Sequence, residues 1–333
     1  SAINNMFTDA QMIGMEEYNA RDAETEDPLK EAAQFTWALP YDLDPEEEVH
    51  GISSNYIRKR RCNELEKFAF PENCVCRSVG IDVGKRALHY VVYGFDSEHR
   101  SYVTDYGVQE VHSDDFGTKK AIQTALVELS DALEKDVAPD QVWIDIRGTD
   151  KTQSWQDAVV DGIHQIGLRA YKPAMGKGIT DSYTLPKKST ETGNVSFLGN
   201  QLHLEWRPDH QLHMAYVDSG YWKSEIHRRL LNDKEAPEAL TLFQATPKEH
   251  FSISQHWTSE QKEAKVTPGY GMKIIWVQKR RTNHYFDAGY LGLAAGEYKI
   301  AYEAARPIPE PGSDAPVSIP AGEIYEQFHS ATR

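Results

Sequence analysis

Three aspartates stand at positions where an ionised side chain needs a partner. Asp82 interrupts an apolar strand pattern, Asp145 ends another, and Asp287 falls in the first turn of a helix pattern. A carboxylate inside an apolar strand is costly unless it is paired or binds a metal. Strand ends are where open α/β sheets bind ligands, and a helix N-terminus favours an anion. We therefore regard the three aspartates as candidate metal ligands.

Such a cluster supports a specific chemistry. Hard cations such as Mg²⁺ and Mn²⁺ prefer oxygen ligands. Two of these ions, about 4 Å apart, can activate a water and stabilise a leaving 3′ oxygen during in-line attack on a phosphate. No histidine base is needed for that reaction, and we expect no basic residue on the next strand directly opposite Asp82.

The elements that must position these residues begin with a meander. Alternating apolar residues predict strands over 75–83, 87–95 and 102–111, joined by short turns. Helical spacing predicts a helix over 119–135, and a short buried strand follows over 141–146. The first two aspartates therefore lie on the first strand of the meander and on the strand after the first helix.

The second half of the chain continues with alternating helices and strands. In chain order, we predict a helix over 152–166, a strand over 168–171, a loop over 173–190, strands and turns over 193–217, a helix over 222–231, irregular structure over 233–270, a strand over 272–277 and a helix over 283–297. A meander followed by such alternation predicts an α/β fold with a mixed sheet and helices on both faces.

The order of the aspartates points to one version of this fold. One aspartate lies in the first strand, one at the end of the strand after the first helix, and one on a late helix. This order resembles the arrangement that brings three carboxylates together in a ribonuclease H fold. Each aspartate taken alone is more often a helix cap or an ion-pair partner than a metal ligand.

Composition divides the chain into three predicted parts. We expect an acidic N-terminal arm with a short basic helix over residues 1–72, the catalytic body over 73–303 and a proline-rich tail over 304–333. Within the arm we place the basic helix over 57–70. Residues 1–49 hold 13 acidic and two basic side chains, so they carry −11 of the net −15 and leave −4 for the rest. Overall charge thus neither supports nor excludes a nucleic-acid partner.

Two function classes are disfavoured by composition. Three cysteines are too few for a disulfide scaffold, which favours a reducing, intracellular setting. The sequence contains no run of about 18 apolar residues, so no transmembrane helix is expected.

The stretch 272–295 carries a family resemblance. It reads as a strand with a tryptophan, a Lys/Arg run, an asparagine, an acidic residue and a Tyr/Ala-rich helix. This resembles the closing motif of large terminase subunits from lambda-like tailed phages. Further similar segments, in the family's order, are Gly80–Asp82, Trp143–Asp145, Val217–Lys223 with Arg228–Leu230, and Phe251–Glu260. The resemblance covers about residues 55–300.

The resemblance implies the nuclease half of a genome-packaging motor. That family cuts concatemeric double-stranded phage DNA with an RNase H-like domain, in the host cytoplasm where virions assemble. The resemblance implies that Asp82, Asp145 and Asp287 bind two Mg²⁺ or Mn²⁺ ions. Expected partners are DNA, the portal protein, the small terminase subunit and an ATPase domain. The segment Gly80–Lys85 is one residue too short for a Walker A loop, so we expect the ATPase domain to lie outside this chain.

Basic residues near the aspartates are candidates for phosphate contact. Lys187 and Lys188 lie in the predicted loop, Arg280 and Arg281 precede the third aspartate, and Arg147 follows the second. Solvated surface is the competing interpretation for each of them.

Other polar residues have simpler interpretations. Asp218 opens a helix, so a helix cap is favoured over a fourth metal-binding carboxylate. His284 stands where the family often has an acidic residue, and we do not expect it to be a ligand. Five histidines match no zinc pattern and are expected to be structural: His203, His210, His213, His250 and His256.

Two alternatives to the packaging nuclease stay open. A resolvase or transposase-like nuclease shares the fold and would prefer branched DNA over a linear duplex. A non-catalytic docking module, using the acidic arm and the tail, would not bind Mn²⁺.

Overall fold

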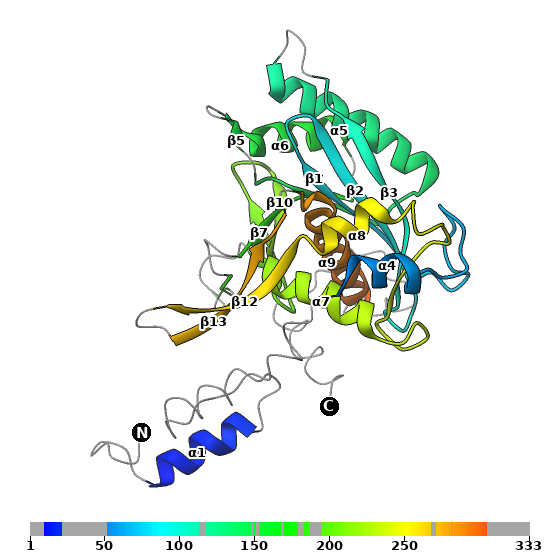
Figure 1. The fold of residues 1–333 in the computed structure, drawn as a ribbon. Helices are drawn as coiled ribbons and strands as arrows, with labels where there is room; N and C mark the ends of the chain where they lie inside the picture. The colour runs from blue at the N-terminus through cyan, green and yellow to red at the C-terminus, as the bar shows by residue number, and fades with distance from the viewer. Residues whose placement is uncertain are drawn as a thin grey trace, which may run out of the picture. The chain divides into compact units, whose positions relative to one another are not determined.

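The chain divides into two compact units, residues 1–50 and 51–333. The computed structural model describes residues 10–21, 52–112, 117–147, 149–150, 153–167, 170–178, 183–184, 186, 195–267, 271–280 and 282–304. In the first unit it describes one helix, α1 (Ala10–Arg21). The second unit holds all the other described elements (Figure 1). The domain boundaries at 72 and 303 stay predictions.

The second unit is built on a nine-stranded sheet with the order β11-β3-β2-β1-β4-β7-β10-β9-β8. The strands are β1 (Cys76–Val83), β2 (Ala87–Phe95), β3 (Ser101–Glu110), β4 (Gln141–Asp145), β7 (Tyr171–Lys177), β8 (Val195–Gly199), β9 (Leu202–Arg207), β10 (Leu212–Asp218) and β11 (Leu240–Leu242). Strands β1, β2 and β3 form an antiparallel meander, and β1, β4, β7 and β10 run parallel. A meander continued by parallel strands is the ribonuclease H-like arrangement, so the predicted fold class is confirmed.

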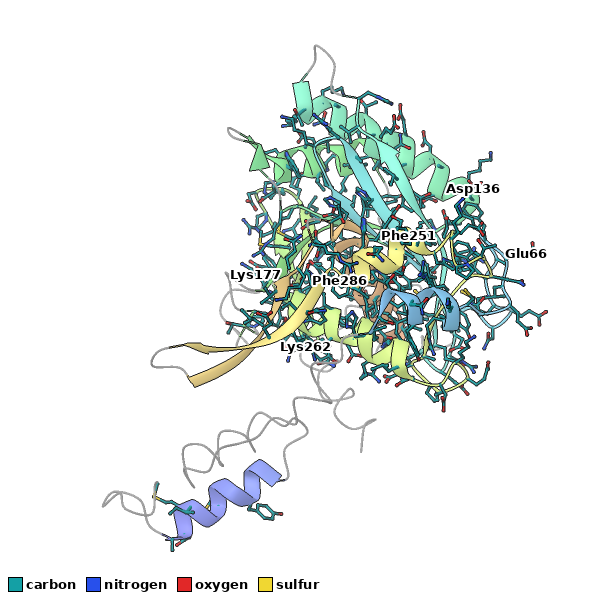
Figure 2. The ribbon with its side chains drawn as sticks, in the orientation of Figure 1. Glu66, Asp136, Lys177, Phe251, Lys262 and Phe286 are labelled. Carbon is teal, nitrogen blue, oxygen red and sulfur yellow. The ribbon has the colours of Figure 1, made fainter. Side chains whose placement is uncertain are left out.

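Helices cover both faces of this sheet (Figure 1). Two of them, α5 (Gly117–Asp136) and α6 (Trp155–Ile166), share one apolar core with the sheet. A second core joins the opposite face to α7 (Ser219–Leu231), α8 (Phe251–Trp257) and α9 (His284–Ala304), with α4 (Ser54–Arg60) beside α8. Phe286 of α9 is fully buried in this second core (Figure 2). We call the two sides the α5/α6 face and the α9 face.

The pleat of β1 assigns its side chains to these two faces. Val79, Ile81 and Val83 belong to the core of the α5/α6 face. Because alternate side chains point to opposite faces of a sheet, Gly80 and Asp82 lie on the α9 face. One strand therefore contributes apolar packing to one side and a carboxylate to the other.

Gly80 sets how closely α9 approaches β1. A Cβ atom at Gly80 would overlap the carbonyl oxygen of Ala288 and the amide nitrogen of Gly292. The Ser78 hydroxyl, also on this face of the strand, donates to the Gly292 carbonyl at 2.6 Å. The first turns of α9 therefore pack directly on the strand that carries Asp82.

Of the strand predicted over 168–171, residues 168–169 lie outside the described residues. The strand here is β7, which begins at Tyr171 and runs to Lys177, into the stretch that we predicted as a loop. Pro173 and Gly176 depress the strand signal in the sequence. Pairing with β4 on one side and β10 on the other stabilises the strand nonetheless.

The region 233–270 was predicted as irregular, and this was wrong. It holds β11, α8 and β12 (Glu260–Thr267), and elements of three and seven residues are too short for a periodic pattern. The strand β13 (Gly271–Gln278) pairs with β12 in a two-stranded ribbon that extends from the body (Figure 1). At its base, the Lys262 ammonium lies 6.0 Å from the centre of the Trp276 ring.

The basic helix was predicted over 57–70 but ends at Arg60. It starts earlier, at Ser54, where the Ser53 hydroxyl accepts a hydrogen bond from the Tyr56 amide. Beyond it, Cys62 forms an isolated bridge with Leu242 on the sheet edge. None of the described helices has the length and apolar composition to cross a membrane.

Candidate functional site

Two of the predicted aspartates lie side by side on neighbouring strands. The parallel pairing of β1 and β4 matches Ile81 with Ile144. Asp82 and Asp145 each follow one residue later, so they occupy the same level of the sheet, on the α9 face. Both are buried, with exposed fractions of 7% and 8%.

The third predicted aspartate approaches from the helix. Asp287 lies in the first turn of α9, one residue before the Ala288 carbonyl that touches Gly80. Its side chain is 24% exposed. The close packing of α9 on β1 thus brings Asp287 to the carboxylates of the two strands.

The charges of the three carboxylates influence one another. Burial, repulsion from Asp82 and, more weakly, from Asp287 raise the pKa of Asp145 well above its usual value. Burial and the charge of Asp82 raise the pKa of Asp287 to about 6, although Lys223 opposes this rise. Mutual repulsion among buried carboxylates is relieved by a cation. An oxygen-donor set that is short of positive charge fits Mg²⁺ or Mn²⁺.

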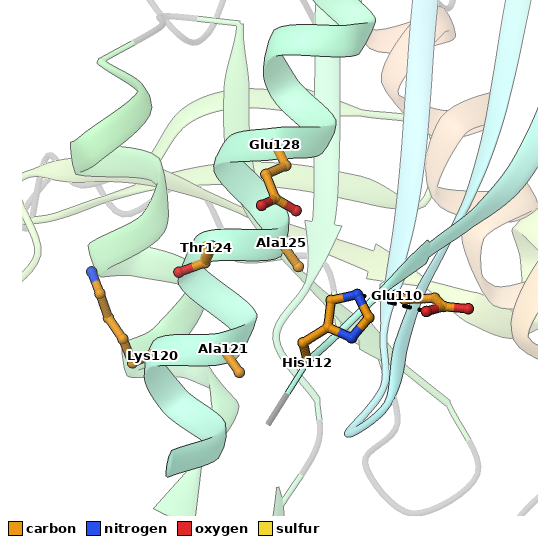
Figure 3. A pocket seen from close by; sticks show the side chains of 7 residues that line it. All are labelled: Glu110, His112, Lys120, Ala121, Thr124, Ala125 and Glu128. Atoms are coloured by element: carbon orange, nitrogen blue, oxygen red, sulfur yellow. Dashed lines mark ion pairs between the residues drawn. The ribbon is translucent and has the colours of Figure 1, made fainter. Parts of the chain in front are cut away.

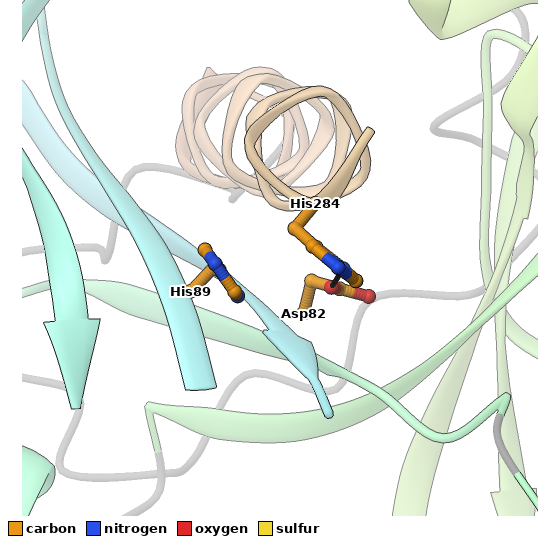
Figure 4. Close-up of side chains that lie close together, drawn as sticks. All are labelled: Asp82, His89 and His284. Atoms are coloured by element: carbon orange, nitrogen blue, oxygen red, sulfur yellow. Dashed lines mark hydrogen bonds and ion pairs between the residues drawn. The ribbon is translucent and has the colours of Figure 1, made fainter. Parts of the chain in front are cut away.

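Two histidines that we did not predict accompany Asp82. His284 Nδ1 donates to Asp82 Oδ2 at 2.7 Å, and this hydrogen bond raises the pKa of His284. His89 lies directly opposite Asp82 on β2, contrary to our expectation that no basic residue stands there. Its ring stacks on His284 with centres 4.4 Å apart (Figure 4). The turn at Gly84 fixes this register.

Asp82, His89 and His284 bring one ligand atom each to within 4.8 Å of the others, so they form a possible Asp/His metal site. The two rings are nearly parallel, at 16°. In-plane lone pairs of parallel rings run side by side and do not converge on one ion. In this arrangement His284 serves Asp82 as a hydrogen-bond donor, and joint ligation by both rings would require a ring to turn.

Asp287 also has partners that the sequence did not reveal. Lys223 Nζ lies 2.8 Å from Asp287 Oδ1 and 2.7 Å from Glu260 Oε1. Asn283, directly before α9, donates from Nδ2 to Asp287 Oδ2 at 2.7 Å. Lys223 and Glu260 each end a segment with family resemblance, and that was their only signal in the sequence.

The basic candidates divide into placed and unplaced residues. Lys187, Lys188 and Arg281 lie outside the described residues. Arg147 is exposed, its backbone N–H donates to Asp145 Oδ1 at 3.0 Å, and its charge lowers the pKa of Asp145. Arg280 is exposed and its guanidinium donates to Gln255. Their contact with DNA stays a prediction.

Asp218 has the capping role that we favoured. Its Oδ1 accepts from the backbone N–H groups of Gly220 and Tyr221 at the start of α7. Among the five histidines expected to be structural, His250 Nε2 donates to the Phe243 carbonyl and its Nδ1 lies 3.0 Å from the Tyr106 hydroxyl. The Tyr285 amide donates to His256 Nδ1. These contacts agree with structural roles.

One open cavity of about 350 Å³ lies elsewhere, between the end of β3 and α5 (Figure 3). Its walls include Glu110, His112, Lys120 and Glu128. His112 Nε2 and Glu110 Oε2 are 3.6 Å apart, and both side chains are more than three-quarters exposed. None of the three predicted aspartates lines this cavity.

Comparison with protein families identifies the chain. Residues 10–304 match the family described as terminase large subunit gpA, endonuclease domain. The chain belongs to this family. The resemblance seen in the sequence is therefore confirmed, and the carboxylate cluster lies within an endonuclease domain. The search for related curated proteins found no match.

Three solved structures have some likeness to this terminase nuclease domain. A Thermus thermophilus RuvC structure is 14% identical with a TM-score of 0.22, and the match covers 30% of this chain and 63% of that chain, less than two thirds of its length. T. thermophilus RuvC in complex with a Holliday junction substrate is 12% identical with a TM-score of 0.28, covering 67% and 96%. The yeast mitochondrial Holliday junction resolvase Ydc2 is 10% identical with a TM-score of 0.32, covering 74% and 84%.

Proposed function

We propose that this chain is a divalent-metal-dependent endonuclease that cuts concatemeric double-stranded DNA during phage genome packaging. The proposal rests on the placement of Asp82 and Asp145 on neighbouring strands with Asp287 on the helix packed against them, and on the influence of their charges on one another. Burial and mutual repulsion raise the pKa of Asp145 and Asp287, so the cluster favours a bound cation. Membership in the endonuclease-domain family supplies the reaction class.

The residues of the site would have two roles, binding the metal ions and orienting the metal ligands. Asp82, Asp145 and Asp287 would hold two Mg²⁺ or Mn²⁺ ions, which when bound supply activation of the attacking water and charge stabilisation for the leaving 3′ oxygen. His284 orients Asp82 through its Nδ1–H, and the Arg147 backbone N–H orients Asp145. Groups that fix the ligands in this way tune a metal site.

The proposal extends to substrate and partners. Five basic side chains would contact the phosphates of the duplex, because positively charged side chains supply most of the affinity for DNA. They are Arg147, Arg280, Arg281, Lys187 and Lys188. Portal protein, small terminase subunit and an ATPase domain would be the packaging partners.

Replacement of Asp82 by asparagine tests the proposal. We expect Asp82→Asn to lower Mn²⁺-dependent cleavage of linear duplex DNA by about a thousandfold, the scale of several kcal/mol of lost transition-state stabilisation. The circular dichroism spectrum should not change. A matched control is Asp105→Asn, because Asp105 is also buried in the sheet but pairs with Lys67 outside the cluster.

Full activity of Asp82→Asn, or of the wild type in EDTA, would refute the proposed mechanism. A Holliday junction in place of the linear duplex separates the related functions. Strong preference for the junction would favour a resolvase, and failure to bind Mn²⁺ would favour a docking module.

A further inference from the structure

A buried lysine lies beside the proposed metal centre. Lys223 of α7 has only 8% of its side chain exposed, and its ammonium reaches one carboxylate on each side. Lysine is rarely buried without a partner, because removing its charge from water is costly. Here the cost is offset by Asp287 and by Glu260, which is 4% exposed.

These residues form a closed ring with Asn283. The two amide hydrogens of Asn283 Nδ2 are directed to Asp287 Oδ2 and Glu260 Oε1, both at 2.7 Å. Glu260 Oε1 therefore accepts from Lys223 and Asn283 together. Both oxygens of Asp287 are held, Oδ1 by Lys223 and Oδ2 by Asn283, and each keeps a second lone pair. The ring joins α7, the root of β12 and the start of α9.

We propose that Lys223, Asn283 and Glu260 form a clamp that fixes the carboxylate of Asp287 as a ligand. Lys223 and Asn283 are the positioning residues that touch Asp287, and Glu260 holds both of them in place. This inference rests on the proposed function of the site. A held carboxylate keeps its remaining lone pairs in a fixed orientation and loses little freedom when a cation binds.

The clamp has a role beyond neutralising its own charges. Asp82 is held by one hydrogen bond from His284, whereas Asp287 is held at both oxygens by donors from two elements. Asp287 stands at the start of a helix, where a small rotation of the side chain would move its oxygens away from the strand carboxylates. Holding both oxygens removes that freedom.

A charge-balanced double substitution separates positioning from stability. Lys223→Met alone leaves Glu260 buried and unpaired, and should lower the melting temperature. Lys223→Met combined with Glu260→Gln removes one charge of each sign. The melting temperature of this double variant should return most of the way to the wild-type value. In the double variant of the full chain we expect about tenfold weaker Mn²⁺ binding by calorimetry and about 10- to 100-fold lower kcat, with KM for DNA within about twofold.

Two further variants serve as controls. Asn283→Ala removes the donor to Asp287 Oδ2 without creating a buried charge, and should give a smaller change of the same kind in kcat and Mn²⁺ affinity. Lys172→Met removes another largely buried lysine, whose Nζ donates to Gln141. It should leave both quantities within about twofold of the wild type.

Wild-type Mn²⁺ affinity and kcat in the double variant, or in Asn283→Ala, would overturn the clamp. Lys223 and Glu260 would then only neutralise each other's charge. If the wild type binds Mn²⁺ but does not cut DNA, only the proposed function is overturned. The Mn²⁺ affinities of the variants then still show whether the clamp positions Asp287. A wild type that binds no Mn²⁺ would overturn both.

Discussion

The two faces of the central sheet are built from the same strands but differ in the side chains that they bury. The α5/α6 face receives Val79, Ile81 and Val83 of β1 and packs them against two helices in an apolar core. The α9 face receives Gly80 and Asp82 from the same strand. There the packing is closer, backbone against backbone, and it encloses carboxylates with raised pKa.

The difference shows how one fold combines stability with a strained electrostatic site. Apolar burial on the α5/α6 face stabilises the strands by roughly 25 cal/mol per Å² of buried area. Burying like charges on the α9 face opposes folding. The apolar face holds β1 and β4 in a register that their carboxylates alone would not favour.

The largest expected effect comes from filling the contact between β1 and α9. Gly80→Ala places a methyl group against backbone atoms of Ala288 and Gly292, which no change of rotamer can relieve. We expect a loss of about 3 kcal/mol in the free energy of unfolding, with displacement of Asp287 and loss of cleavage. Its neighbour Ile81, on the α5/α6 face, is the control: Ile81→Val should cost about 1 kcal/mol and keep activity. Urea denaturation checks both, and equal costs would contradict the comparison.

A smaller effect of opposite sign is expected at Asp145. Because its folded pKa is raised above the unfolded value, the charged carboxylate opposes folding at neutral pH, and stability is regained as pH falls through the folded pKa toward about 4. Asp145→Asn should therefore stabilise the metal-free protein at pH 7 by about 1 kcal/mol or more while removing cleavage.

The measurement for Asp145→Asn is the difference in melting temperature between variant and wild type at pH 7 and at pH 5. This difference should shrink as the pH is lowered, because the raised pKa makes the wild-type carboxyl gain its proton earlier than an ordinary aspartate would. Asparagine can still accept from the Arg147 amide through its side-chain oxygen, so that contact is kept. A variant less stable than the wild type at pH 7 would show that the α9 face is not under charge repulsion.

The smallest effect is expected from surface charge. Arg280→Glu, near the start of α9, should weaken duplex binding by about three- to tenfold and reduce the slope of log affinity against log salt by about 1. Lys135→Glu, at the exposed end of α5, is the matched reversal on the other face. Fluorescence anisotropy at several salt concentrations measures both. Equal losses from the two reversals would mean that DNA binding does not distinguish the faces.

Much of the architecture could be predicted from local patterns. The meander strands, both long helices and the mixed α/β sheet follow from periodicity, because repeating apolar positions record which side of an element is buried. Prediction failed at β7, where Pro173 and Gly176 hide a strand that only its neighbours stabilise, and at β11 and α8, which are too short for a period.

The sequence by itself determined the residues of the candidate cluster, because a carboxylate inside an apolar strand or a helix start is conspicuous along the chain. Only the tertiary structure decided which residues surround these three aspartates. His284 lies 202 positions from its partner Asp82 in the sequence. Lys223 lies 64 positions from Asp287 and 37 from Glu260. Such contacts depend on how α7, β12 and α9 pack over the sheet, and no local period records that packing.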